Sequence, residues 1–181
     1  MLDPEEFRKG LRAFTTGVTV VTVPDGAGGM HAMTASSFAA ISVKPQLAAV
    51  SIAKRAKAHA LMMATTLYAI NLLAEGQGML ANYFANRLKA KHEPDYVWAH
   101  GVPILAGTMG WFACKRWAAY DGGDHTIFVG EAIALHRTDD PPLVCSRGRF
   151  HQLGSRLATE LLPSHEERRR EAEENLTCRG K

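Results

Sequence analysis

Most apolar residues of the chain recur with the short period of β-strands. Residues 18–23 (VTVVTV) are β-branched or threonine throughout and predict a buried strand. The turn residues 25–29 (DGAGG) follow directly, so we expect a hairpin into a strand at 30–37. Further strands are predicted at 47–53, at 67–73, at 107–118, at 126–137 and, after Pro141-Pro142, in a short stretch leading into 147–153.

Three segments of the main body have helical character instead. The first begins behind Asp3, a good N-cap residue, and places Phe7, Leu11 and Phe14 on one face. The other two helices are predicted at 56–64 and 76–86. The Lys/His/Pro-rich segment 87–103 predicts a loop, which we expect to cover a site.

Many short strands with few helices exclude a doubly wound parallel sheet and favour an antiparallel barrel with helices around it. The length of 181 residues fits one domain, which we place at residues 1–154. From residue 155 the composition becomes polar, and residues 155–181 are predicted to be a helical or frayed tail.

Composition, charge and the absence of certain motifs argue against several functional classes. The formal charge of +3 comes without a Lys/Arg-rich face, so we expect no nucleic acid partner. No uninterrupted apolar run is long enough to span a membrane. The three cysteines, Cys114, Cys145 and Cys178, have no metal-ligand spacing and favour a reducing, cytoplasmic compartment. No Rossmann glycine motif, G-x-S-x-G elbow or Walker loop is present.

Two segments in the first third of the chain have residue types suited to a nucleotide. Residues 33–38 (MTASSF) combine small side chains with hydroxyl groups, which allow a planar heterocycle to approach the backbone. Residues 51–59 (SIAKRAKAH) lead from a strand through a basic turn into a helix, an arrangement that suits a phosphate. A hydroxyl-rich strand edge and a solvated basic turn are the ordinary alternatives.

Two later segments carry the polar side chains of a second candidate region. Residues 123–126 (GDHT) place a carboxylate and an imidazole at the start of a long strand. Residues 147–151 (RGRFH) alternate arginines with an aromatic ring, which suits a pyrophosphate or a ring edge. An exposed loop histidine and a charged outer strand face are the alternatives here.

In this order, the segments resemble the flavin reductase family of FMN-binding split barrels, the reductase component of two-component flavin-dependent monooxygenases. The resemblance covers residues 5–154, with landmarks that include FTTGVTVVT at 14–22, GDHTIFVGEA at 123–132 and RGRFHQLG at 147–154. It implies a mainly β fold, a six-stranded antiparallel Greek-key split barrel. It also implies a homodimer with flavin near the subunit interface.

The resemblance also assigns roles to individual residues. Four would line the isoalloxazine ring, namely Thr34, Ala35, Ser36 and Ser37. Others would follow the ribityl chain and phosphate, namely Ser51, Ala53, Lys54, Lys57 and Ala58. Those near the nicotinamide would be Asp124, His125, Arg149 and Phe150, with His125 as a positioning group.

The implied activity is hydride transfer from NADH or NADPH to FMN or FAD, with reduced flavin supplied to a partner monooxygenase. The alternative is a non-enzymatic electron carrier or flavin-binding protein of the same fold, for which the GDH segment would have no use. One departure stands out. The family usually has a Ser-x-Ser/Thr pair in the phosphate turn, where this chain has Ala56 and Ala58. We therefore expect weak phosphate binding and a flavin that acts as a diffusing substrate.

Overall fold

The structure, a computed structural model, describes residues 2–89 and 94–155. Its main feature is one antiparallel sheet of seven strands in the order β3-β2-β6-β9-β10-β5-β4. The strands are β2 (Thr19–Pro24), β3 (Met30–Ala35), β4 (Ala39–Ser42), β5 (Leu47–Ala53), β6 (Leu67–Leu72), β9 (Gly110–Gly122) and β10 (His125–Arg137). The mainly β class is confirmed, although this sheet has seven strands where six were expected.

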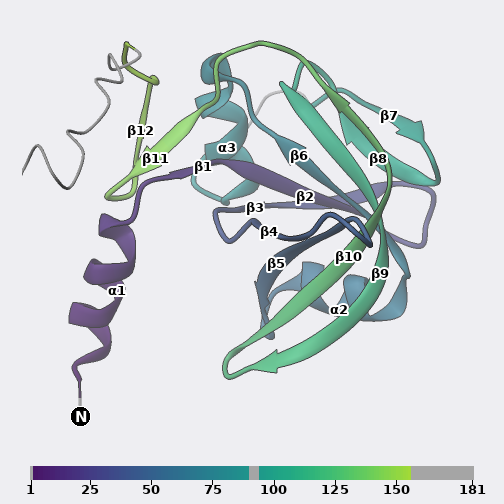
Figure 1. Ribbon diagram of the computed structural model, residues 1–181, viewed down its shortest axis with the longest axis horizontal. Coiled ribbons are helices and arrows are strands. Elements are labelled where there is room, and N and C mark those ends of the chain that lie inside the picture. Colours follow the sequence, from purple (N-terminus) through teal and green to yellow (C-terminus); the bar gives the residue numbers. More distant parts are fainter. Residues whose placement is uncertain (1, 90–93, 156–181) are drawn as a thin grey trace, which may run out of the picture.

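The described residues also form two smaller sheets and three α-helices (Figure 1). One small sheet has the order β1-β11-β12 and the other pairs β7 with β8. Their strands are β1 (Thr16–Gly17), β7 (Tyr96–Ala99), β8 (Val102–Leu105), β11 (Val144–Ser146) and β12 (Arg149–His151). The helices are α1 (Pro4–Ala13), α2 (Lys57–Ala64) and α3 (Gly78–Phe84), the last preceded by a 3₁₀ turn at Glu75–Gln77.

The predicted loop at 87–103 is wrong in its second half, which forms most of the β7–β8 hairpin. His100 and Gly101 make its two-residue turn, with φ of +52° and +77°, the backbone that type I′ hairpins require. All four residues of β8 are buried. The amide of Leu105 donates to Asn71 Oδ1 over 3.0 Å, which fixes β8 against β6. The lysine, histidine and proline content of the segment concealed this short buried strand.

The longest pairing is the β9–β10 hairpin, which reverses at Gly123 and Asp124. Gly123 has φ of +79°, a conformation that glycine adopts without steric cost. The register shifts twice along β10, between Val129 and Gly130 and between Ala132 and Ala134. Such bulges bend a strand and increase its twist. The predicted strands at 107–118 and 126–137 are therefore confirmed, and the connection between them is shorter than expected.

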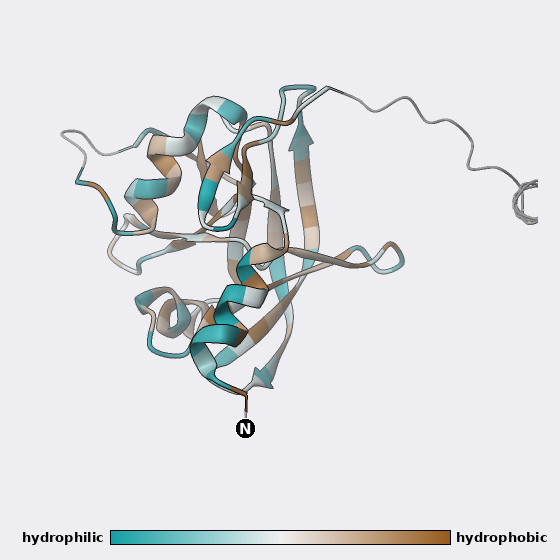
Figure 2. Ribbon diagram, turned by 90° about the vertical axis from the view of Figure 1, so that its left-hand side faces the viewer, coloured by the Kyte–Doolittle hydropathy of each residue, from teal (hydrophilic) through white to brown (hydrophobic). Residues whose placement is uncertain are grey.

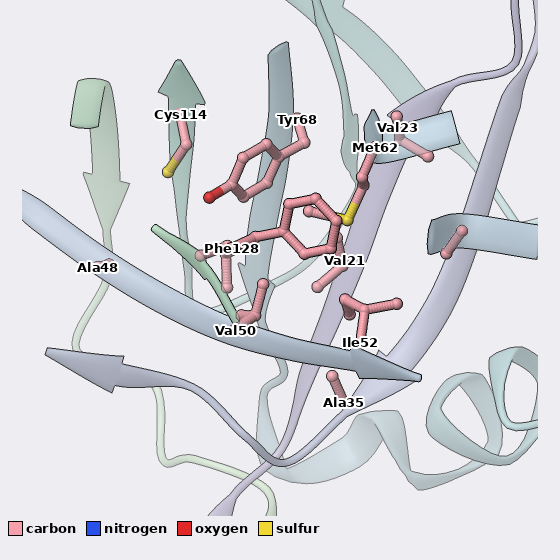
Figure 3. Close-up of a cluster of buried hydrophobic side chains, with 12 residues drawn as sticks. Val21, Val23, Ala35, Ala48, Val50, Ile52, Met62, Tyr68, Cys114 and Phe128 are labelled. Atoms are coloured by element: carbon pink, nitrogen blue, oxygen red, sulfur yellow. The ribbon is translucent and has the colours of Figure 1, made fainter. Parts of the chain in front are cut away.

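The largest core cluster lies under β10 (Figure 3). Val50, Ile52, Tyr68 and Phe128 are 0–1% exposed, and full burial of an apolar side chain contributes about 1.5–3 kcal/mol. Gly130 completes this packing, because a Cβ atom there would collide with the ring and hydroxyl of Tyr68 and with Cys114.

The two ends of the main sheet meet through a side chain. β3 is an edge strand, and β5 lies next to the opposite edge. Just after β3, Ser37 Oγ donates to the carbonyl of Ser51 on β5 and accepts from the amide of Ser51, each over 3.0 Å. The sheet therefore curls until its first and sixth strands come together.

Helices α1 and α3 share an amphipathic pattern but not an environment. The N-cap of α1 is confirmed, since Asp3 Oδ1 accepts from the amides of Glu5 and Glu6. No residue of α1 is buried, and Phe7 is 56% exposed on a helix directed away from the sheet (Figures 1 and 2). In α3, Phe84 is buried against the sheet. The predicted tail at 155–181 lies outside the described residues, apart from Ser155.

Candidate functional site

The hydroxyl-rich segment predicted to bind a ring lies at the end of the edge strand β3. Thr34 Oγ1 donates to the carbonyl of Ala81 on α3 over 2.7 Å, and Ser37 is engaged with Ser51. Ala35 is buried and Ser36 is exposed. Two of the three hydroxyl groups thus hold the segment in place. The groups left for a ligand are the Ser36 side chain and the outer backbone edge of β3, since β3 pairs only with β2 in the described sheet.

Strand pairing brings two other predicted segments together. β5 runs antiparallel to β10 with Ala53 opposite His125 and Ser51 opposite Ile127. The amide of Lys54 donates to the carbonyl of Asp124 over 3.0 Å. Lys54 Nζ lies 2.5 Å from Asp121 Oδ2. Ser37, Ser51, Lys54 and His125, which are up to 88 residues apart in sequence, therefore belong to one end of the curled sheet.

The basic turn ends at the N-terminus of α2. Ala56 is the N-cap residue, and its side chain makes no capping hydrogen bond. Lys57 is exposed, while Ala58 is fully buried against the core. His59 Nε2 lies 2.8 Å from Thr126 Oγ1 on β10. The first-turn amides of α2 thus lack a side-chain cap from Ala56, and this helix is tied to the strand that begins at His125.

The GDH segment forms a compact polar pair at the hairpin tip. His125 Nδ1 donates to Asp124 Oδ1 over 2.7 Å. This hydrogen bond, followed by the charge of His125, holds the pKa of Asp124 below its usual range. The side chain of Asp124 is 94% exposed and that of His125 is 43% exposed. The carboxylate therefore fixes the imidazole ring and leaves Nε2 for a ligand.

The RGRFH segment lies elsewhere, in the hairpin of β11 and β12. Phe150 packs on the cluster beneath α3, whereas Arg149 is exposed. A small hollow of about 170 Å³, which we call the Thr34 hollow, joins Phe150 to the β3 segment. It is lined by Val18, Thr34, Ser36, Ala85, Arg87, Cys145, Gly148 and Phe150. His125 and Arg149 do not line this hollow.

Sequence reasoning missed Arg87 and Ala85, which line the Thr34 hollow from the chain just after α3. The signal for them was weak. Asn86, between these two residues, has φ of +56°, which asparagine tolerates better than most residues. That conformation ends α3 and directs the next residues toward β3, but no motif in the sequence marks it.

Cys114 on β9 is fully buried in the core. Burial raises the pKa of the Cys114 thiol to about 12, so the nucleophilic thiolate is not formed at neutral pH. Residues 2–89 and 94–155 contain no group of three or more His, Cys, Asp or Glu placed to hold a metal ion.

The same two ranges contain no helix that is both long and apolar enough to cross a membrane.

Comparisons with known proteins give the family. Residues 11–154 match the model of the flavin reductase like domain. The chain is 42% identical over 147 residues to FMN reductase (NADH) SmoA of Agrobacterium fabrum, covering 80% of this chain and 83% of that protein.

Two solved structures have the same fold. The flavin reductase PheA2 superposes with a TM-score of 0.82 at 32% identity, covering 85% of this chain and all of that one. BorF, the flavin reductase component of a bacterial two-component tryptophan halogenase, gives a TM-score of 0.77 at 35% identity with the same coverage. The chain therefore belongs to the family of flavin reductase like domains.

Proposed function

We propose that the protein is an NADH-dependent flavin reductase that transfers a hydride from the reduced nicotinamide to FMN or FAD. The observation that carries the proposal is the gathering of Ser37, Ser51, Lys54 and His125 at one end of the sheet. Family membership supports an oxidoreductase, and the name of SmoA supports NADH as donor and FMN as acceptor.

The edge of β3 fits a flavin ring. Its outward backbone groups provide several donors and acceptors in a row, and Ser36 adds a hydroxyl group. A flat ring with carbonyl and nitrogen atoms along its rim needs such an edge. Because Thr34 and Ser37 already bond to protein atoms, we assign them to the support of this edge.

His125 is proposed as the residue that positions the nicotinamide. Its Nδ1 is held by Asp124, so the remaining nitrogen can bond to the carboxamide or to a phosphate of the dinucleotide. The bound nicotinamide and flavin supply the chemistry, with hydride passing from C4 of one ring to N5 of the other. The protein has to hold the rings at reacting distance and exclude water. Arg149 and Phe150 lie in a different part of this chain from His125, so their place beside the nicotinamide is proposed from the family resemblance alone.

Weak phosphate binding is proposed at the turn before α2. Lys54, Lys57 and the first amides of α2 remain for the phosphate, but Lys54 is already paired with Asp121. Each hydrogen bond lost to a charged phosphate costs about 1.5–3 kcal/mol. Flavin would then be a diffusing substrate. Protein that stays saturated with flavin after long dialysis would contradict this.

Reduced flavin is proposed to pass to a flavin-dependent monooxygenase. The name of BorF, the flavin reductase component of a two-component tryptophan halogenase, supports a two-component system, and the monooxygenase as partner is proposed from the family resemblance. We further propose that residues 1–154 form the split-barrel domain, supported by the curl of the sheet, and that the polar segment 155–181 lies outside it.

A homodimer is proposed through an exposed apolar surface beside β4. Val43 is 79% exposed, Leu135 is 59% exposed and Ile133 is 48% exposed, and all three line an apolar hollow of about 550 Å³. Leu135→Lys should convert a dimer to a monomer in analytical ultracentrifugation. Wild-type protein that sediments as a monomer at micromolar concentration would contradict the proposal.

The activity is tested by mixing protein, flavin and NADH without oxygen. Bleaching of the flavin absorbance, catalytic in protein, is expected with FMN or FAD, and NADPH serves as the comparison donor. An electron carrier would bind flavin without bleaching it. Binding without bleaching would therefore contradict the reductase and support the non-enzymatic alternative.

A further inference from the structure

A large hollow in the described structure has no part in the proposed reaction. It has a volume of about 620 Å³ and lies between β3, the end of α3 and β7. We call it the β3–α3 hollow, and its lining includes Asp25, His31, Ala32, Tyr83, Asn86 and Tyr96. Its volume is within the usual range of 300–1,000 Å³ for small-molecule sites.

This hollow continues the surface on which the flavin ring is proposed to lie. Ala32 lines the β3–α3 hollow and Thr34 lines the Thr34 hollow. Two residues apart on a strand, they face the same side of β3 about 7 Å from each other. Along the chain after α3, Asn86, which lines the larger hollow, lies between Ala85 and Arg87, which line the smaller one. The Thr34 hollow alone, at about 170 Å³, is too small for a whole dinucleotide.

The lining suits a purine nucleoside. Tyr83 and Tyr96 present aromatic rings, and base–aromatic stacking does not require a specific base. The Asp25 carboxylate accepts from the amides of Ala27 and Gly29 through Oδ1, while Oδ2 accepts no hydrogen bond from the described residues. Oδ2 can therefore accept from an exocyclic amine or from a ribose hydroxyl group.

The basic turn before α2 lies near the same hollow. Burial lowers the pKa of His31, and the charge of Lys57 lowers it further, which places the cation of Lys57 within electrostatic reach of His31. His31 alternates with Ala32 on β3, so its side chain is directed toward α2, where Lys57 provides a cation that suits the phosphates, while Tyr96 packs on the side of Ala32 and suits a base. The hollow and the turn thus provide the two environments that a nucleotide needs.

We propose that the β3–α3 hollow binds the adenosine part of a dinucleotide substrate. The inference rests on the proposed function, and it adds a binding site for the half of the substrate that does not react. Two dinucleotides carry this group, FAD and NADH, and the experiment separates them by using analogues that lack adenosine.

The test compares wild type with Tyr96→Ala, His31→Ala and Tyr96→Phe, and uses Met79→Ala as the matched control. Met79 lies on α3 but is 77% exposed and outside the hollow. One arm measures the Kd of FAD and of FMN by quenching of flavin fluorescence. The second arm measures the KM of NADH and of reduced nicotinamide mononucleotide with FMN as acceptor. Circular dichroism verifies the fold of each variant.

If FAD is the occupant, Tyr96→Ala should weaken FAD about tenfold and leave FMN within twofold, as expected for one lost stacking contact. If NADH is the occupant, the KM of NADH should rise about tenfold while that of the mononucleotide does not. Tyr96→Phe should retain wild-type values, and His31→Ala should act on the same ligand as Tyr96→Ala.

The adenosine site would be overturned if folded Tyr96→Ala and His31→Ala variants change neither the Kd of FAD relative to that of FMN nor the KM of NADH relative to that of the mononucleotide. Affinity that falls equally for ligands with and without adenosine would overturn it as well. Failure of the proposed function looks different, since wild type would then reduce none of the flavins with either donor.

Discussion

Two residues near the start of β10, His125 and Phe128, have the same pairing and opposite surroundings. Both are paired with β5 on one side and β9 on the other. Phe128 is fully buried, yet His125, three residues earlier, is 43% exposed and bonded to a carboxylate that is 94% exposed. Strand pairing therefore fixes where each residue lies, and the surroundings of its side chain determine whether it packs in the core or remains available to a ligand. Variants of Phe128 should change the free energy of unfolding, and variants of His125 should change ligand binding.

The largest effect is expected for Phe128→Ala. Removal of a fully buried ring leaves a cavity and should lower the free energy of unfolding by about 3–5 kcal/mol. Urea unfolding followed by circular dichroism measures the loss. His125→Ala, three residues earlier on β10, is the matched control and should stay within about 0.5 kcal/mol of wild type. Equal losses for the two variants would remove the distinction between the two positions.

The next effect is expected for Gly130→Ala, by overpacking. The new Cβ atom would meet the Tyr68 hydroxyl first and Cys114 next, at a cost of about 1–3 kcal/mol. Tyr68→Phe should restore part of this loss, because it removes the hydroxyl group that lies nearest. By itself Tyr68→Phe should be close to neutral, since the Tyr68 hydroxyl is buried without a hydrogen-bond partner among the described residues. A double variant no more stable than Gly130→Ala would show that Tyr68 is not the obstacle.

A smaller effect, confined to one ligand, is expected for His125→Ala. Loss of the positioning hydrogen bond should raise the KM of NADH about tenfold, or about 1.4 kcal/mol, and change kcat less than twofold. Steady-state kinetics with saturating flavin measures both constants. An unchanged KM would remove His125 from the nicotinamide site.

The smallest effect is expected for Ala56→Ser, which adds the missing N-cap of α2. A serine at this position should stabilise the protein by about 1 kcal/mol and strengthen FMN binding several-fold, because its hydroxyl can serve either the helix or the phosphate. Urea unfolding without flavin isolates the first contribution, and FMN titration isolates the second. A serine that changes neither quantity would argue against a phosphate site at this turn.

The sequence predicted the strands well but not their register. β-Branched runs such as 18–23 identify a strand from local pattern alone. The contacts of Ser37 with Ser51 and the position of His125 opposite Ala53 depend on which strands pair, and local periodicity does not carry that information. The proximity of these residues was available in advance only through the family resemblance.

Helix prediction had a similar limit. The apolar stripes of α1 and α3 look alike in sequence, yet Phe84 is buried and Phe7 is exposed. Periodicity predicts that a helix has an apolar face and does not say what covers it. The hairpin at β7 and β8 was missed for a different reason, since a buried proline, Pro103, disguised a strand of only four residues.

The open edge of β3 has a consequence for the solubility of the protein. An edge strand with free backbone groups can pair with a strand of another molecule, which is a common route to aggregation. On β3 these are the same groups that we assign to the flavin ring, so a bound flavin and an added strand would compete for one edge. Concentrated protein without flavin is therefore expected to aggregate first, and excess flavin to delay it.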